Sequence, residues 1–336
     1  MEVIGRRWHE AQLGRWSPGY AIKIIQALER DVFPEIGRLP LVDVDGPAVL
    51  DSLRRVEQRG AIDTAKRIRQ YVSAIFVFGK NEGLCGADPA GTDLVGSLKP
   101  TPVGGSMSGL SDISELRKLH AAVDASSAYP LTKLASRLLG LTFVRPGLVA
   151  TAKWAEIEGI DWSDPKSGMT SGAPIWRLSA ERMKLKKKEK ADQAFDHIVP
   201  LPPQAVDVLR AVHKLTGRCQ YLFHSNRSLN EPMSDSTIGV AYNCVGYTGR
   251  HVPHGWRTSF STIMNERAAE LDRDIDRLII DAMLSHKPRG VSSEEMAYNR
   301  AKYMWRRWEL AGWWADETTA GLCPPMDLLI GRERAG

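Results

Sequence analysis

Four side chains suited to phosphate chemistry fall within one stretch of the sequence, between residues 254 and 298. His254 and Arg257 stand three residues apart in His254-Gly-Trp-Arg257, His286 follows in Leu-Ser-His286, and Tyr298 follows in Ala-Tyr298-Asn-Arg. A guanidinium binds phosphate oxygens, an imidazole moves a proton near neutral pH, and a tyrosine oxygen can attack phosphorus. Together these groups could break a DNA strand through a covalent link to the protein.

Composition fits a polyanionic partner and a reducing compartment. The 336 residues carry a net charge of +5 and a pI of about 9.0, a mildly basic balance that agrees with nucleic-acid binding. The four cysteines are scattered, with no CxxC pair: Cys85, Cys219, Cys244 and Cys323. This pattern argues against a zinc site and a disulfide framework and favours the cytoplasm. We therefore expect no metal and no cofactor.

Neither a membrane span nor a signal peptide is indicated. No apolar run approaches the ~20 residues that cross a bilayer, and the first eight residues lack the apolar stretch of a signal peptide. We expect a soluble, intracellular protein that is not associated with a membrane.

The first ninety residues predict a small helical bundle. Ser17-Pro18 begins one amphipathic helix, Asp45-Gly-Pro47 begins a second, and a third is expected from Asp63 to about Phe78. The third helix starts with three basic residues, which could be a solvated helix start or a face that contacts DNA phosphates: Lys66, Arg67 and Arg69. Residues 1–90 are predicted to form a domain without a catalytic site.

A linker is expected at residues 91–110, where glycine, proline, serine and threonine are abundant. The second domain, residues 111–336, should begin with a helix capped by Asp112. A buried helix is expected from Tyr129 to Val144, and it ends at Arg145-Pro-Gly147. Arg145 could simply pair with the last carbonyls of that helix.

Three short apolar runs in the second domain predict a small antiparallel sheet: 154–160, 175–178 and 198–201. Between the last two runs lies a lysine-rich arm, which could be a solvated loop or a probe for the phosphate backbone. Its lysines are Lys184, Lys186, Lys187, Lys188 and Lys190. The remainder should be mostly helical, so the fold class is mainly α (α+β).

These motifs, taken in order, resemble the tyrosine recombinases, and are most similar to the integrases of phages, satellite phages and genomic islands. The resemblance runs from about residue 17 to 314. It is carried by Arg145 in Phe-Val-Arg-Pro-Gly, Lys184 in Glu-Arg-Met-Lys, His197-Ile-Val-Pro-Leu, the HxxR motif, Leu-Ser-His286 and Ala-Tyr298-Asn-Arg. It implies a helical core-type DNA-binding domain followed by a catalytic domain.

The resemblance also assigns roles. Tyr298 would be the nucleophile that forms a 3′-phosphotyrosyl link, and Arg145, Arg257 and His286 would bind the phosphate oxygens. His254 would take the tyrosine proton, and Lys184 would protonate the departing 5′-oxygen. The implied partners are double-stranded DNA attachment sites, a homotetramer assembled on DNA, and accessory DNA-bending or directionality proteins.

Two departures from the family pattern stand out. Leu148 occupies the position of a supporting glutamate, which leaves the bracing of Arg145 in question. The arm after Lys184 is longer than usual, which makes Lys186 a second choice for the catalytic lysine. In addition, many such integrases begin with an arm-binding domain, so this chain would be either a natural short form or a truncated one.

Several alternatives stay open. Tyr303, five residues after Tyr298, is a competing nucleophile. The segment from Tyr303 to Trp314 is expected to be a helix docked on its own domain, and the resemblance offers packing on a neighbouring protomer as the alternative. The function expected is integration or excision of a mobile element. The alternatives are a catalytically inactive DNA-binding relative and strand relaxation like that of a type IB topoisomerase.

Overall fold

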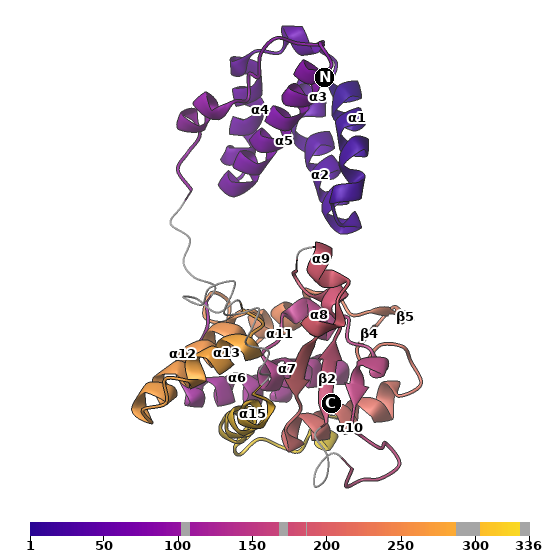
Figure 1. Cartoon of the computed structure of the whole chain (residues 1–336), viewed down its shortest axis with the longest axis vertical. Coiled ribbons are helices and arrows are strands. Elements are labelled where there is room, and N and C mark those ends of the chain that lie inside the picture. The colour runs from indigo at the N-terminus through magenta and orange to yellow at the C-terminus, as the bar shows by residue number, and fades with distance from the viewer. Residues whose placement is uncertain (102–107, 168–173, 186, 287–302, 330–336) are drawn as a thin grey trace, which may run out of the picture. The chain divides into compact units, whose positions relative to one another are not determined.

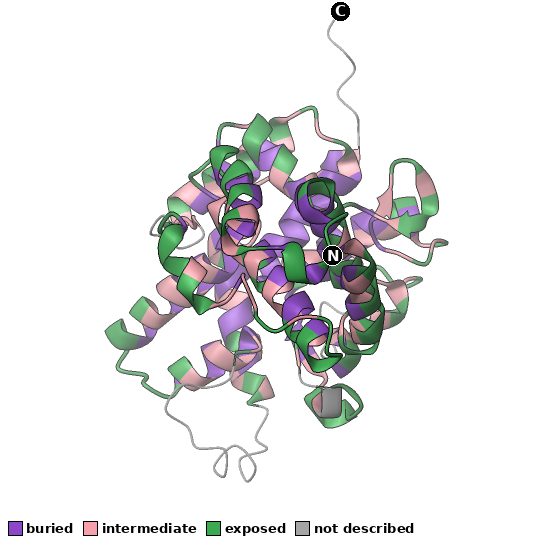
Figure 2. Ribbon diagram, turned by 90° about the horizontal axis from the view of Figure 1, so that it is seen from above, coloured by how far each residue is buried: buried purple, intermediate pink, exposed green. Residues whose placement is uncertain are grey.

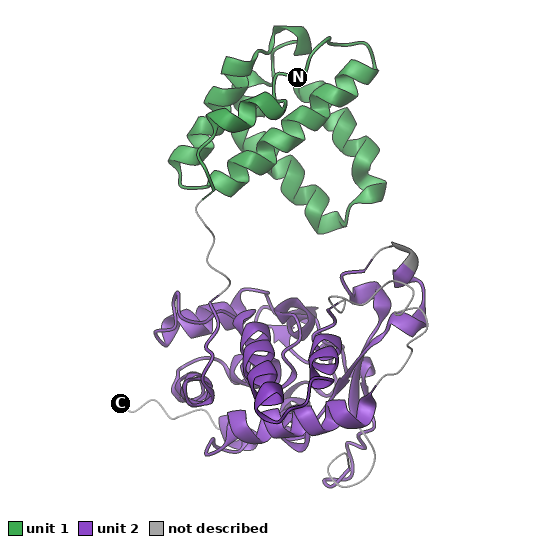
Figure 3. Ribbon diagram, turned by 60° about the vertical axis from the view of Figure 1, so that its left-hand side comes forward, with its two compact units in different colours: residues 1–105 green, residues 106–336 purple. Residues whose placement is uncertain are grey.

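The chain folds into two compact units, Met1–Gly105 and Ser106–Gly336, which are coloured separately in Figure 3. The structure is a computed structural model, and it describes residues 1–101, 108–167, 174–185, 187–286 and 303–329. The fold is mainly helical with small antiparallel sheets, as the sequence predicts.

The N-terminal unit is a helical bundle (Figure 1) made of α1 (Glu2–Gln12), α2 (Pro18–Asp31), α3 (Phe33–Ile36), α4 (Gly46–Gln58) and α5 (Ile62–Asn81). Proline at the first turn begins α2, and the Asp45 carboxylate caps α4 by accepting from the Ala48 amide. The three predicted helices are therefore confirmed. The sequence analysis missed α1, whose residues Gly5 and Trp8 are buried in the unit.

The C-terminal unit contains most of the remaining elements. Its helices are α6 (Ile113–Ala125), α7 (Pro130–Thr142), α8 (Pro146–Ala150), α9 (Lys187–Lys190), α10 (Pro203–Thr216), α11 (Thr237–Cys244), α12 (Gly255–Glu270), α13 (Asp276–Met283) and α15 (Met304–Thr319). Helix α7 is buried on nearly every side, and α6, α8, α10, α11 and α15 all contact it. Buried residues follow the inward sides of the surrounding helices (Figure 2). Asp112 caps α6 as predicted, by accepting from the Glu115 amide.

The predicted three-stranded antiparallel sheet is confirmed. It consists of β1 (Ile157–Glu158), β2 (Ile175–Leu178) and β3 (His197–Pro200), with β2 in the centre and Trp176 opposite Val199. The lysine-rich arm between β2 and β3 contains short helical turns, including α9, and not a continuous extended hairpin. A second sheet of β4 (His224–Ser225) and β5 (Ser228–Pro232) was not predicted.

The expectation that the segment after Tyr303 docks on its own domain is confirmed. Helix α15 packs against α6 and α7, and Trp314 is fully buried, where its indole donates to the carbonyl oxygen of Gly140 at 2.8 Å. Across the described ranges, no helix combines the length and the apolar character that a membrane span requires.

Candidate functional site

Arg257 lies at the centre of a group of cationic and imidazole side chains. It stands on the first turn of α12 and is only 5% exposed. Its Nη1 donates to the carbonyl oxygen of Phe143 (3.2 Å), and its Nη2 donates to the carbonyl oxygen of Leu284 (2.5 Å) and to Nε2 of His286 (2.9 Å). A guanidinium has five N–H donors, so within the described chain two of them, one on Nη1 and one on Nε, have no protein acceptor. These two donors can bind an anion.

Two left-handed backbone positions present these carbonyls to Arg257. Phe143 ends α7 with φ of 41°, and Ser285, which follows Leu284, has φ of 51°. Non-glycine residues rarely adopt this conformation, and it persists only where the surrounding structure enforces it. At Phe143 the enforcement is visible, because its ring is buried and stacks on Phe260 of α12 with centroids 3.5 Å apart.

Arg145 is the second cation of the group. It is the residue that precedes α8, it is half-buried, and its side chain has no hydrogen bond within the described chain. The alternative that it pairs with the last carbonyls of α7 is therefore not what the structure shows. Burial lowers the pKa of Arg145, and burial together with the charge of Arg145 lowers the pKa of Arg257 to about 10. No described carboxylate pairs with either arginine, so the pair is electrostatically suited to a bound anion.

His286 lies between Arg257 and Asp281, an acid at the end of α13. Its main-chain amide donates to the Asp281 carbonyl (2.8 Å), and its Nδ1 is 3.6 Å from Oδ1 of Asp281. Burial and the charge of Arg257 lower the pKa of His286, although Asp281 opposes them. Because arginine can only donate, Nε2 of His286 must accept from Arg257, which places the proton of the neutral ring on Nδ1.

His254 immediately precedes α12, one turn before Arg257. Burial lowers its pKa, and so do the charges of Arg257, Arg145 and His286, so the ring is neutral at pH 7 and can take up a proton. The start of α12 is fixed by a close approach to the end of the linker. A side chain on Gly255 would come within 2.5 Å of the Ser108 carbonyl oxygen, and the Val252 amide donates to that same oxygen.

His197 joins the group although the sequence analysis used it only as part of a motif. Burial is the largest cause that lowers its pKa to about 3; the charges of Arg307, Arg257 and Arg145 act in the same direction, and a hydrogen bond to the main chain of Met283 opposes them. Arg307 is buried on α15, and it donates to the carbonyl oxygen of Ile198. Asp281 and Arg307 were likewise missed; the five-residue spacing between Asp281 and His286 was the one available signal.

Lys184 is not brought into this group. It is exposed, after a turn whose Arg182 donates to Thr151 Oγ1 (2.6 Å) and pairs with Glu156. The base of the arm is therefore anchored beside α8, while Lys184 makes no contact with Arg145 or Arg257 within the described chain. Leu148, at the position expected for glutamate, is buried in the hydrophobic core, so it provides no polar brace for Arg145.

Tyr298 lies outside the described residues, and its position as nucleophile stays a prediction. Tyr303, the competitor, precedes α15 with φ of 45° and is 36% exposed. After Tyr303, Arg306 makes a two-point ion pair with the buried carboxylate of Asp276, with distances of 2.9 and 2.5 Å. Both flanks of the segment 287–302 are thus fixed to α13.

The predicted DNA-contacting lysines and arginines have different surroundings. Lys66 donates to Thr101 Oγ1 (2.6 Å), and Arg69 donates to the carbonyl oxygens of Ala90 and Gly91. Both therefore help to fix the chain that follows α5, whereas Arg67 makes no hydrogen bond within the described chain. Lys186 lies outside the described residues, and Lys187 and Lys188 begin α9.

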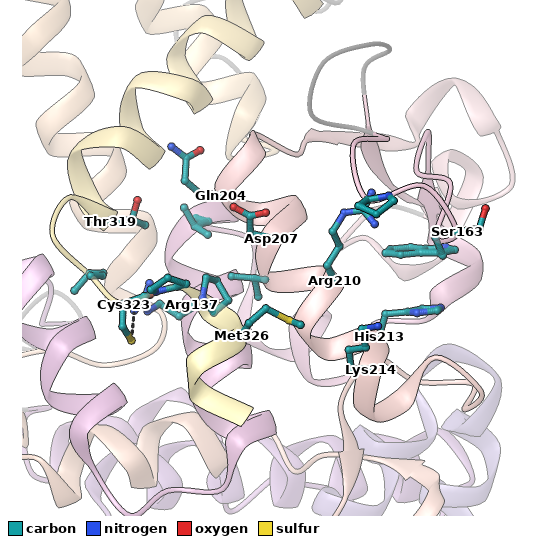
Figure 4. Close-up of a pocket in the computed structure, with 17 residues that line it drawn as sticks. Arg137, Ser163, Gln204, Asp207, Arg210, His213, Lys214, Thr319, Cys323 and Met326 are labelled. Atoms are coloured by element: carbon teal, nitrogen blue, oxygen red, sulfur yellow. Dashed lines mark hydrogen bonds between the residues drawn. The ribbon is translucent and has the colours of Figure 1, made fainter. Parts of the chain in front are cut away.

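A pocket lies elsewhere in the C-terminal unit (Figure 4). It has a volume of about 600 Å³ and is lined by α10, by Trp162 and by the segment after α15. Arg137 meets Cys323 at one end, and His213 and Lys214 lie at the other. None of its lining residues belongs to the Arg257 group, so the pocket is not the predicted catalytic site. Across the described chain, no group of three His, Cys, Asp or Glu residues could hold a metal ion.

Two further histidines lie buried behind the start of α12. His120 stacks on Trp256 with centroids 4.6 Å apart, and neither of its ring nitrogens has a hydrogen-bond partner in the described structure. His251 accepts from the Leu110 amide (3.1 Å). Burial lowers the pKa of His120 well below its usual value and that of His251 to about 4. Both rings are neutral in the folded protein.

We expect the C-terminal unit to lose stability as the pH falls below about 6.5, where histidines of the unfolded chain take up protons that the folded chain cannot. Each buried histidine should lower the free energy of unfolding by about 1.4 kcal/mol per pH unit between pH 6 and 5. The substitution His120→Leu should reduce this slope by about one such contribution. Urea unfolding at pH 5, 6 and 7, followed by tryptophan fluorescence, measures the slope; equal slopes in both proteins would contradict the expectation.

Comparisons with known proteins cover both units. The family model for the central domain of phage integrases matches residues 1–94. Prophage integrase IntZ of Escherichia coli (strain K12) is 30% identical over 304 residues, which cover 90% of this chain and 67% of IntZ. Prophage integrase IntA of the same strain is 28% identical, with coverage of 94% and 68%. A lambda integrase tetramer bound to a Holliday junction superposes with a TM-score of 0.60 at 16% identity, with coverage of 87% and 78%.

Proposed function

This chain belongs to the tyrosine recombinase family of phage integrases, and from that membership we infer that it is a site-specific DNA recombinase. The single observation that supports this function at the candidate site is that Arg145 and Arg257 lie near each other. Two half-buried or buried guanidiniums without a described carboxylate partner are costly unless an anion binds between them. A scissile phosphate meets that requirement.

We propose that Arg145, Arg257, His254 and His286 act on this phosphate together with Tyr298, and that His286 donates from Nε2 to a phosphate oxygen. Tyr298 attacks phosphorus, the 5′-oxygen leaves, and a 3′-phosphotyrosyl bond stores the energy of the broken phosphodiester. Arg145 and the two free donors of Arg257 stabilise the charge that spreads over the phosphate oxygens in the transition state. His254, neutral and one turn from Arg257, takes the tyrosine proton.

Lys184 is proposed as the acid that protonates the leaving 5′-oxygen, with Lys186 as the second choice. Because Lys184 is exposed, this role requires the arm to approach the phosphate when DNA binds. Arg182 supports this role, because it anchors the base of the arm beside α8, which begins directly after Arg145. Since the covalent intermediate conserves the bond energy, the reaction needs neither a metal nor a nucleotide cofactor.

We propose double-stranded attachment-site DNA and three further copies of this chain as the partners. The lambda integrase structure is a tetramer on a Holliday junction, and exchange between two duplexes requires four active sites. Residues 1–90 are proposed to be a core-type DNA-binding domain, which the family match over residues 1–94 supports, with a linker at 91–110 and the catalytic domain at 111–336. Arg67, Lys187 and Lys188 are proposed DNA contacts, together with Lys66, Arg69 and Lys186. Accessory DNA-bending proteins and a location at the bacterial nucleoid are part of the same proposal.

Strand exchange between two duplexes tests the function. We expect the protein to join a labelled duplex from the element's end to an unlabelled target duplex, which gives a recombinant product on a denaturing gel. A type IB topoisomerase would relax a supercoiled plasmid and give no joint product. An inactive relative would bind the duplex and give neither product.

A further inference from the structure

The Nε2 atom of His286 must serve two partners that require opposite protonation states. In the structure it lies 2.9 Å from Nη2 of Arg257, which can only donate, so Nε2 carries a lone pair. In the proposed function the same atom donates to a phosphate oxygen, which can only accept, so Nε2 must then carry a hydrogen. The binding of DNA therefore requires a change at this ring.

The ring can gain a hydrogen on Nε2 in two ways. The single proton of the neutral ring can move from Nδ1 to Nε2, or a second proton can be taken up from the solvent. The first way leaves the lone pair of Nδ1 facing the Asp281 carboxylate 3.6 Å away, which is repulsive. The second way keeps the Nδ1 hydrogen toward Asp281 and creates a charge that this carboxylate attracts.

We propose that Asp281 is a positioning residue for recombination: its carboxylate, 3.6 Å from Nδ1 of His286, attracts the Nδ1 hydrogen and favours uptake of a second proton when the scissile phosphate binds. The proton comes from water or buffer and resides on Nε2, and no other bond changes. The inference rests on the proposed function in one respect, namely that the anion bound by the arginines and His286 is a DNA phosphate.

The geometry around His286 supports this assignment. The charged and titratable groups that face the ring in the described chain are Arg257 from α12, His254 just before α12, Arg145 before α8 and Asp281 from α13. Both cations oppose a second proton, and Asp281 is the one group that favours it. A bound phosphate would neutralise the two cations. The charge of Asp281 would then be the main influence on the protonation state of His286. The main-chain amide of His286 also donates to the main-chain carbonyl oxygen of Asp281 at 2.8 Å. This bond keeps the carboxylate of Asp281 close to the ring of His286.

The effect of Asp281 on the protonation of His286 can be measured without DNA. Nitrogen-15 NMR of histidine-labelled full-length protein, with His286 assigned through His286→Gln, should show the Nδ1–H tautomer. The variant Asp281→Asn should lower the pKa of His286, Asp281→Glu should restore it in part, and Asp274→Asn, which removes an exposed carboxylate just before α13, should leave it unchanged. An Nε2–H tautomer in the native protein, or equal pKa values in the native and Asp281→Asn proteins, would overturn the proposal.

Cleavage of a nicked attachment-site duplex gives the second readout. We expect Asp281→Asn to slow adduct formation by about 10–100-fold at pH 7.5, by analogy with removal of a carboxylate that orients a metal-bound histidine. The deficit should shrink toward pH 6, because the solvent then supplies the proton more readily. An equal deficit at every pH would mean a purely structural role and would refute the proposal. If the native protein formed no adduct at all, the proposed function would fail, while the NMR result would still decide whether Asp281 affects the protonation of His286.

Discussion

The substitution Tyr298→Phe should abolish the covalent protein–DNA adduct. The phenylalanine ring keeps the size of the side chain but lacks the oxygen that attacks phosphorus, so no 3′-phosphotyrosyl bond can form. Removal of a nucleophile from a covalent enzyme lowers the rate by about 10⁶-fold, which is below detection on a gel. The substrate is a nicked duplex that covers the end of the element next to the gene, and a denaturing gel separates the slow-migrating adduct from free DNA.

Tyr303→Phe is the matched control. This residue is a tyrosine five positions further on, at the start of α15, with a partly exposed side chain. We expect adduct formation by Tyr303→Phe at nearly the native rate. An adduct from Tyr298→Phe together with its loss in Tyr303→Phe would move the nucleophile to Tyr303. Binding of the duplex by the native protein without any adduct would favour the inactive DNA-binding relative.

The second large effect is expected from Arg257→Lys. The native guanidinium donates to two carbonyl oxygens and to His286 while it keeps two donors for the phosphate. A lysine ammonium has three donors on one atom and cannot span these positions. We expect the rate of adduct formation to fall by about 10²–10³-fold, the effect of removing a donor to a developing oxyanion. Unsatisfied carbonyl groups should also lower the free energy of unfolding by about 1–3 kcal/mol.

Arg267→Lys controls for the loss of a guanidinium from the same helix. Arg267 lies on α12 over the ring of Trp313, 4.0 Å from its centroid, and outside the Arg257 group. A lysine there keeps a cation over the ring, so cleavage should stay within a few-fold of the native rate. Single-turnover cleavage at saturating protein separates the chemical step from DNA binding. If Arg257→Lys cleaved DNA at the native rate, the proposal that Arg257 stabilises the transition state would be wrong.

Local sequence patterns predict the fold class, the order of the reactive residues and the helices α2, α4, α5, α6, α7 and α15. The serine–proline start of α2 and the aspartate caps of α4 and α6 are local signals, since each depends on residues within one helical turn. The sheet followed from three short apolar runs bounded by turn residues. Helix α1 was missed because its charged and polar residues obscure the apolar stripe that contains Trp8.

Only the tertiary structure decided how Arg257 and His286 are held. The acceptors of Arg257 are main-chain oxygens of residues 143 and 284, which lie 114 and 27 positions away along the chain. Because every residue has the same main-chain carbonyl group, no pattern of side chains predicts which carbonyl oxygen will accept a hydrogen bond from Arg257. The left-handed turns at Phe143 and Ser285 also run against local preference and exist because the packed unit enforces them. The protonation of His286 depends in turn on Arg257 and Asp281, which come from two helices that meet only in the folded domain.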